Sequence, residues 1–155
     1  AARHPHRIAG MVIVNAFLHL EADDRTRRLA LYDLLLEEDG LERWADQLLN
    51  LMGVEGHPAI VRGFHRSLES LDPAHIRGIF RQQIDWDQRP DLQHISCPVL
   101  VVQGMRDGFI PGYCADDMLD GLRDGRRVVL DTGHLPYLEA PAVFNRVLSD
   151  FLSGH

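Results

Sequence analysis

Three short apolar runs, rich in β-branched residues, constrain the fold of this chain more than any other feature. They cover residues 8–15, 97–103 and 127–130, and each is bounded by Gly, Pro or Asp residues that are typical of turns. Strands buried on both faces have this pattern, because helices cover both sides of a parallel sheet and leave no solvent-facing side. The sequence therefore predicts an α/β fold with three central strands of a parallel sheet.

Helical patterns follow the second and third runs. Residues 113–123 carry apolar side chains at helical spacing and end at Asp124-Gly125, which predicts a strand-helix-strand unit. After the third run, Pro141 stands in the first turn of a last helix whose apolar stripe reaches Leu152. We expect this last helix to pack on the sheet.

A long helical insertion separates the first strand from the second. Residues 18–89 contain no strand-like run, and their apolar residues predict four helices, in the ranges 29–36, 41–52, 60–71 and 72–86. Asp72 is the expected N-cap of the fourth helix, with Pro73 in its first position. Simple connections in such folds have roughly 2–6 residues. We therefore expect a helical cap at 18–89 between two parts of the core, 1–17 and 90–155.

Composition narrows the class of protein. The 155 residues correspond to about one domain, with 16 basic and 23 acidic residues and a net charge of −7. All of the basic residues are arginines scattered among acids, which argues against nucleic acid as a partner. No apolar run is long enough to cross a membrane, and two cysteines are too few for a disulfide framework. We expect a cytoplasmic protein with no membrane or nucleic-acid partner.

Two polar residues follow neighbouring strands at the point where each strand ends. Asp107 comes after the second run and His134 after the third, 27 positions later, which is enough for one helix and one strand. The carboxyl ends of parallel strands meet at one edge, where ligands bind. A carboxylate that accepts from one imidazole nitrogen fixes the tautomer and leaves the other nitrogen to act as a base. Asp107 and His134 are therefore the candidate catalytic residues.

The motifs around this pair resemble the carboxyl-terminal half of an α/β hydrolase. The similar motifs are, in chain order, residues 95–104, Asp107, Gly133-His134, the Glu139-Ala-Pro141 that opens the last helix, and Phe151-Leu152. Residues 1–8 resemble the end of the helix that follows the nucleophile. The resemblance implies hydrolysis of a small-molecule ester or lactone without a cofactor, with His134 as the triad base and Asp107 as its acid.

The nucleophile of such an enzyme has no counterpart in this chain. The family's order of nucleophile, acid and base places a Gly-x-Ser-x-Gly elbow before Ala1, together with both oxyanion-hole amides. We expect a missing amino-terminal half, or a second chain, to supply them, and we expect the chain alone to be inactive. The hydroxyls of Ser67, Ser70, Ser96 and Ser149 and the thiols of Cys97 and Cys114 do not lie on a strand-to-helix elbow.

Several apolar residues are candidates for binding the substrate. Phe17, Phe109 and Leu135 follow strand ends, which places them near the proposed site. Trp44 and Trp86 are further candidates, although their positions on helical stripes favour plain core packing.

Other interpretations remain open at this point. Asp107 before Gly108 is also a turn signal, and His134 is also compatible with a surface loop. Asp131 is a rival acid, but it lies too near His134 in the chain to orient it easily. The nine histidines show no zinc-type spacing. Epoxide, haloalkane or carbon-carbon bond hydrolysis shares this half of the family, and a non-catalytic fragment or assembly module is the alternative from another class.

Overall fold

A three-stranded parallel sheet organises the computed structural model, which describes residues 1–154. The strands are β1 (Met11–Val14), β2 (Val99–Gly104) and β3 (Gly125–Leu130), and β2 lies between the other two. Met11 is opposite Val99, which is in turn opposite Gly125, so all three strands end at the same edge. The predicted α/β class and parallel sheet are confirmed.

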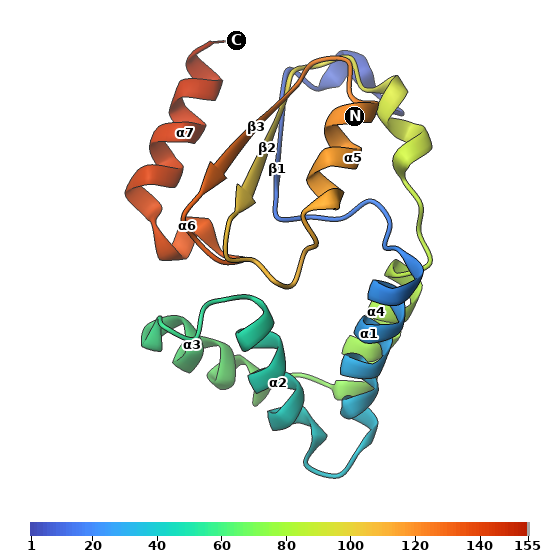
Figure 1. Cartoon of the computed structure of the whole chain (residues 1–155), viewed down its shortest axis with the longest axis vertical. Helices are drawn as coiled ribbons and strands as arrows, with labels where there is room; N and C mark the ends of the chain where they lie inside the picture. Colours follow the sequence, from blue (N-terminus) through green and yellow to red (C-terminus); the bar gives the residue numbers. More distant parts are fainter. Residues whose placement is uncertain (155) are drawn as a thin grey trace.

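Helices cover both faces of this sheet (Figure 1). On one face lie α5 (Tyr113–Gly121) and the 3₁₀ helix η3 (Arg89–His94), and on the other lies α7 (Pro141–Ser153). The short helix α6 (Pro136–Glu139) leads into α7, and a 3₁₀ turn, η1 (Pro5–Arg7), precedes β1. The predicted strand-helix-strand unit and the last helix are therefore present.

Alternate side chains of β2 enter two different cores. Val99 and Val101 pack in the cluster that contains Met118 of α5, whereas Leu100 and Val102 pack in the cluster that contains Phe151 of α7. This division follows from the two-residue period of a strand, which points successive side chains to opposite faces. The middle strand is thus buried on both sides, as a continuous apolar run predicts.

The prediction of a strand buried on both faces is wrong for β3, whereas for β1 it stays a prediction, because the expected amino-terminal half would pair with its free edge. All four residues of β1 are only partly buried, and four of the six residues of β3 are exposed. Within residues 1–154, β1 and β3 are the edges of the sheet, and each has a strand on one side alone. An apolar run identifies a strand but does not establish how many neighbours it has. Arg126 and Arg127 are successive residues that point to opposite faces, and both are exposed, so β3 is open to solvent on both faces there.

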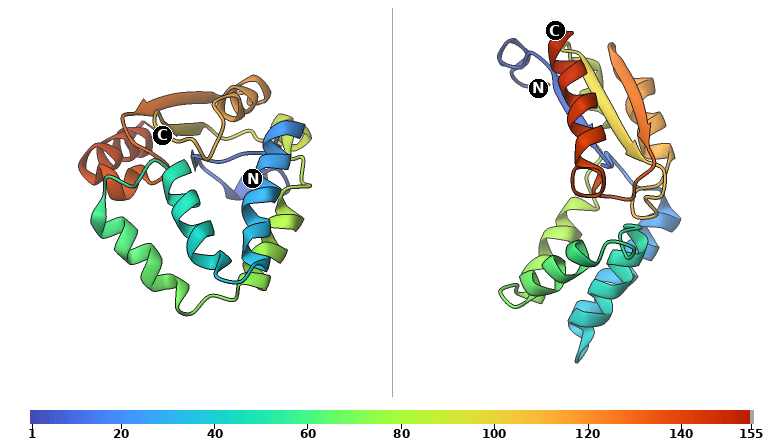
Figure 2. Two further views of the ribbon diagram at one scale, coloured as in Figure 1. Left: turned by 60° about the horizontal axis from the view of Figure 1, so that its bottom comes forward. Right: turned by 90° about the vertical axis from the view of Figure 1, so that its left-hand side faces the viewer.

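The connection from β1 to β2 includes four α-helices and the short 3₁₀ helix η2, which lie beneath the carboxyl ends of the strands, before it continues into η3 (Figures 1 and 2). Their bounds are α1 Ala22–Asp33, η2 Leu34–Leu36, α2 Gly40–Leu51, α3 Pro58–Leu68 and α4 Pro73–Gln83. The first helix starts earlier than predicted, because residues 22–28 are mostly polar and lack the apolar stripe used to locate it. Asp72 accepts a hydrogen bond from the Ala74 amide at 2.9 Å, so the predicted N-cap is confirmed.

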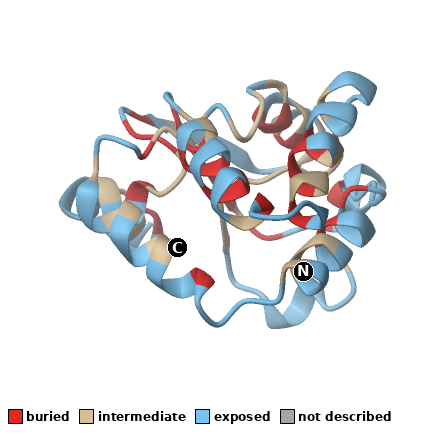
Figure 3. Ribbon diagram, turned by 90° about the horizontal axis from the view of Figure 1, so that it is seen from below, coloured by how far each residue is buried: buried red, intermediate tan, exposed pale blue. Residues whose placement is uncertain are grey.

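These helices bury a core of their own (Figure 3). Tyr32 stacks on Phe80 with ring centroids 3.6 Å apart, and Trp44 meets Tyr32 edge-on at 5.6 Å. Burial raises the pKa of the Tyr32 hydroxyl to about 12. None of the helices between residues 1 and 154 combines the length and the apolar character needed to cross a bilayer.

The two-sided burial of β2 predicts a large difference between two Leu→Ala variants. Leu100 is 0% exposed and Leu36 is 64% exposed. Leu100→Ala should lower the free energy of unfolding by about 2–5 kcal/mol, because it opens a cavity between the sheet and α7. Leu36→Ala, the matched control, should change it by no more than about 0.5 kcal/mol. Urea unfolding of the two variants checks this, and equal losses would contradict the packing described.

Candidate active site

Asp107 and His134 meet at the carboxyl edge of the sheet. The Oδ2 atom of Asp107 lies 2.8 Å from Nδ1 of His134, which confirms the proximity predicted from their positions after adjacent strands. A carboxylate can only accept a hydrogen bond, so the proton of this contact belongs to Nδ1. In the neutral imidazole Nε2 then carries the lone pair, and no hydrogen bond from residues 1–154 reaches this nitrogen. This arrangement can remove a proton from a group placed against Nε2.

The second oxygen of Asp107 is fixed by the backbone that follows it. Oδ1 accepts hydrogen bonds from the amides of Phe109 at 2.8 Å and Ile110 at 3.1 Å, and the side chain is only 2% exposed. The turn interpretation and the catalytic interpretation are therefore compatible. One oxygen closes the turn, and the other faces the imidazole.

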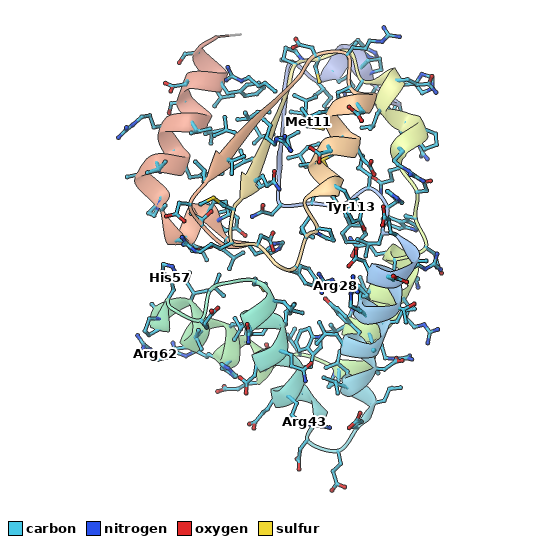
Figure 4. All side chains as sticks on the ribbon, in the orientation of Figure 1. Met11, Arg28, Arg43, His57, Arg62 and Tyr113 are labelled. Atoms are coloured by element: carbon cyan, nitrogen blue, oxygen red, sulfur yellow. The ribbon has the colours of Figure 1, made fainter. Side chains whose placement is uncertain are left out.

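Glu139 holds the loop that carries His134. Its carboxylate, 1% exposed, accepts from the amides of Gly133 at 2.8 Å and Leu135 at 3.0 Å, the two residues that flank His134. Arg106 Nη2 lies 3.8 Å from this carboxylate, and Nε2 of His57, which precedes α3 (Figure 4), lies 3.5 Å away. Glu139 belongs to the Glu139-Ala-Pro141 motif, but that motif alone does not indicate this role.

Asn15 joins the ends of all three strands. Its side-chain amide donates to the carbonyls of Gly133 at 3.1 Å and His134 at 2.9 Å, and its Oδ1 accepts from the Gly104 amide at 2.8 Å. The residue is 8% exposed and adopts a φ of 42° directly after β1. In the sequence pattern Asn15 is only the last residue of the first apolar run. A polar residue that closes an apolar strand at the ligand-binding edge is the signal that identifies it.

The residue that follows α2, Met52, approaches this edge closely, and Gly133 makes that approach possible. The His134 amide donates to the carbonyl of Met52 at 2.7 Å. A Cβ on Gly133 would lie 2.2 Å from that same carbonyl oxygen, a separation that no side chain tolerates. Gly133 is therefore required for the helical region to hydrogen-bond to the His134 backbone.

The predicted substrate-binding residues are not all at this edge. Phe109 packs edge-on against His134 with ring centroids 5.3 Å apart, and Leu135 lines an apolar pocket with residues of α3. Phe17 packs on the margin of the helical core, and Trp44 lies inside it, where it contacts Tyr32 and Phe64. Trp86 is 54% exposed after α4. The structure thus packs Phe109 against His134, whereas Leu135 faces α3.

No nucleophile stands against the imidazole among residues 1–154. Ser67 and Ser70 donate to carbonyls of Phe64 and Ser67, at 2.6 and 3.1 Å. Both cysteines are buried, and burial raises the pKa of the Cys114 thiol to about 12, which keeps it protonated and unreactive. The rival acid Asp131 pairs with Arg106 instead of His134. In the same range, no cluster of three or more His, Cys, Asp or Glu residues is arranged to hold a metal ion.

The known proteins that resemble this chain share one fold. A RutD protein of Escherichia coli O157:H7 (strain EC4115 / EHEC), whose name describes a carbamate hydrolase, is 26% identical over 99% of this chain and 60% of its own length. A pyrrolizixenacetamide deacetylase of Xenorhabdus hominickii is 27% identical over 98% of this chain and 59% of its own length. The enol-lactonase from Burkholderia xenovorans LB400 superposes with a TM-score of 0.82, at 22% identity, over 99% of this chain and 59% of its own.

The chain has the fold of the α/β hydrolases. No family model matches its sequence. It spans about 60% of the length of the curated relatives that it matches. The order of strands, helical insertion, Asp107 and His134 along this chain is the order that the sequence motifs predicted.

The two hydrogen bonds to Glu139 make a prediction about Glu139→Gln. The glutamine amide presents one N–H₂ toward two backbone N–H donors, so one donor loses its acceptor in a buried site. The free energy of unfolding should fall by about 1–3 kcal/mol. Glu38→Gln, at an exposed position, is the matched control and should have little effect. Urea unfolding measures both, and equal stability of the two variants would contradict the role given to Glu139.

Proposed function

We propose that this chain provides the acid and base of an α/β hydrolase that cleaves a small carboxylic ester or lactone by Ser-His-Asp acyl transfer. The observation that carries the proposal is the 2.8 Å contact of Asp107 with His134, which leaves Nε2 free at the ligand-binding edge. Residues 18–89 would form the cap over this edge.

In this mechanism, Nε2 of His134 takes the proton of a serine hydroxyl while the serine oxygen attacks the carbonyl carbon of the substrate. The resulting imidazolium donates its proton to the leaving alcohol, and an acyl-enzyme forms. A water then attacks the acyl group with His134 again as the base, which releases the acid and restores the serine. Asp107 holds the ring in the correct tautomer and stabilises the imidazolium at both stages.

The nucleophile and the oxyanion-hole amides would come from a partner segment, that is, a segment or second chain outside these 155 residues. β1 pairs with β2 along one edge, and no strand of residues 1–154 pairs with its other edge. This free edge supports the placement of a partner segment there. Apolar grooves flank β1 on both faces, one lined by Ile8 and Phe151 and the other by Met11 and Ile13. Met11 is labelled on β1 in Figure 4. An unpaired edge with apolar flanks favours pairing with another strand.

The choice of acyl transfer over other hydrolyses rests on the named relatives. A carbamate hydrolase, a deacetylase and an enol-lactonase all cleave a bond at a carbonyl carbon, whereas an epoxide or haloalkane has no carbonyl. The apolar ring of Phe109 beside His134 suits a small acyl group. We therefore place this chain with the ester and lactone hydrolases.

The proposed role of His134 predicts the kinetics of a completed enzyme. With the partner segment present, His134→Ala should lower the turnover of a nitrophenyl ester by about 10³-fold or more, because the serine then lacks its base. His65→Ala is the control: this histidine lies on α3, where it pairs with Asp46 at 3.2 Å, and its loss should change turnover little. The 155-residue chain alone should show no turnover. Turnover by the chain alone that disappears in His134→Ala would refute the need for a partner segment.

The free edge of β1 makes a separate prediction about association. Without a partner segment, the chain should self-associate, because β1 exposes unpaired backbone groups between apolar grooves. Ile8→Lys, at a position 37% exposed in one groove, should reduce this association in light scattering. Leu36→Lys, at an exposed position on η2, should not. A monodisperse monomer whose β1 amides exchange slowly would favour an autonomous, non-catalytic module instead.

A further inference from the structure

Arg28 is a buried cation beside the loop that carries Asp107. It lies on α1 and is only 6% exposed (Figure 4). Its Nη2 atom donates to two backbone carbonyls, those of Gly108, at 3.1 Å, and Phe109. Its Cζ atom lies 4.5 Å from the centroid of the Phe109 ring, which itself packs on His134. The sequence pattern does not indicate a role for Arg28, because an arginine on a polar helix usually faces solvent.

The charge of Arg28 has a partner of opposite sign one helical turn away. The Asp24 carboxylate accepts from Arg27 and, at 3.0 Å, from the Tyr113 hydroxyl. Burial alone would raise the pKa of Asp24, but these hydrogen bonds outweigh it and lower that pKa. An ionised Asp24 compensates part of the cost of burying Arg28. The guanidinium itself binds backbone oxygen, so its position is tied to the loop after β2.

The two carbonyls that Arg28 binds belong to the same peptide units that bind Asp107. The carbonyl of Gly108 and the amide of Phe109 form one peptide unit, and the carbonyl of Phe109 and the amide of Ile110 form the next. Arg28 takes the carbonyl end of each unit, and Asp107 Oδ1 takes each N–H end. Because a peptide unit is planar and rigid, fixing its carbonyl fixes the direction of its N–H. Hydrogen bonds in such a chain also polarise one another.

We propose that Arg28 is a positioning residue for the acid–base pair. Through two peptide units it holds the Asp107 carboxylate so that Oδ2 faces His134 and keeps the imidazole proton on Nδ1. No other hydrogen bond among residues 1–154 reaches the Gly108 or Phe109 carbonyl, so Arg28 alone performs this function there. The catalytic consequence of this role rests on the proposed function, but its structural consequence does not.

Substitution at Arg28 tests this role without any substrate. Arg28→Met keeps the apolar stem and removes both hydrogen bonds, and Arg28→Lys keeps a charged donor. Arg62→Met, at an exposed position on α3, is the matched control. Two quantities are measured: deuterium exchange of a peptide spanning residues 106–112, and the position of the ring proton of His134 in ¹⁵N-histidine spectra. The signal of His134 is assigned by its loss in His134→Ala.

In Arg28→Met, we expect the amides of Phe109 and Ile110 to exchange about 10-fold faster or more, as loss of a hydrogen bond to a charged group implies. The fraction of His134 with its proton on Nδ1 should fall, and Arg28→Lys should restore part of both effects. Arg62→Met should match the wild type. Exchange of a β2 peptide monitors the fold, and a variant with an altered β2 is replaced by Arg28→Gln. An unchanged tautomer and exchange rate in the folded variant would overturn the proposal.

Activity separates this inference from the proposed function. In the completed enzyme, Arg28→Met should lower kcat for the ester about 10-fold while KM changes little, because the base is misoriented and substrate contacts remain. If Arg28→Met alters the tautomer but Asp107→Asn leaves turnover unchanged, the proposed function fails and the positioning role stands. If Asp107→Asn abolishes turnover and Arg28→Met leaves both kcat and the tautomer unchanged, the positioning role fails.

Discussion

The side-chain amide of Asn15 joins three strand ends that backbone pairing alone leaves free to diverge. Parallel strands exchange hydrogen bonds along their length, but beyond their last residues the chain needs other partners for its N–H and C=O groups. Asn15 meets this need by accepting from Gly104 and donating to the carbonyls of Gly133 and His134. The separation of the loops after β2 and β3 is thereby set, and the contact between Asp107 and His134 depends on that separation.

Three buried polar side chains at this edge each form two or more hydrogen bonds. Asp107 binds two amides and the imidazole, Glu139 binds the amides that flank His134, and Asn15 binds both loops. A buried polar group without a partner costs more than a hydrogen bond returns, so this network is stable only when it is complete. Its completeness holds the imidazole in place before any substrate arrives, which is the preorganisation that acid–base chemistry requires.

Sequence patterns predicted the strands and the pair Asp107 and His134 more accurately than the burial of those strands. A continuous apolar run and the interval between Asp107 and His134 sufficed for the fold and the pair, because strand geometry and chain order are local properties. The same patterns overestimated the burial of β3, since burial depends on neighbouring elements that no local pattern describes. Asn15 and Arg28 escaped notice for a related reason: their partners lie 118 and 80 residues away in the chain.

The helical region between β1 and β2 contributes to the site through its backbone contacts as well as its position. Met52 at the end of α2 accepts from the His134 amide, and Arg28 on α1 binds the loop after Asp107. A rigid movement of α1 and α2 away from the sheet would break both sets of hydrogen bonds and leave buried groups without partners. These two helices are therefore tied by hydrogen bonds to the edge that carries Asp107 and His134, and in the proposed hydrolase substrate entry must leave them in place.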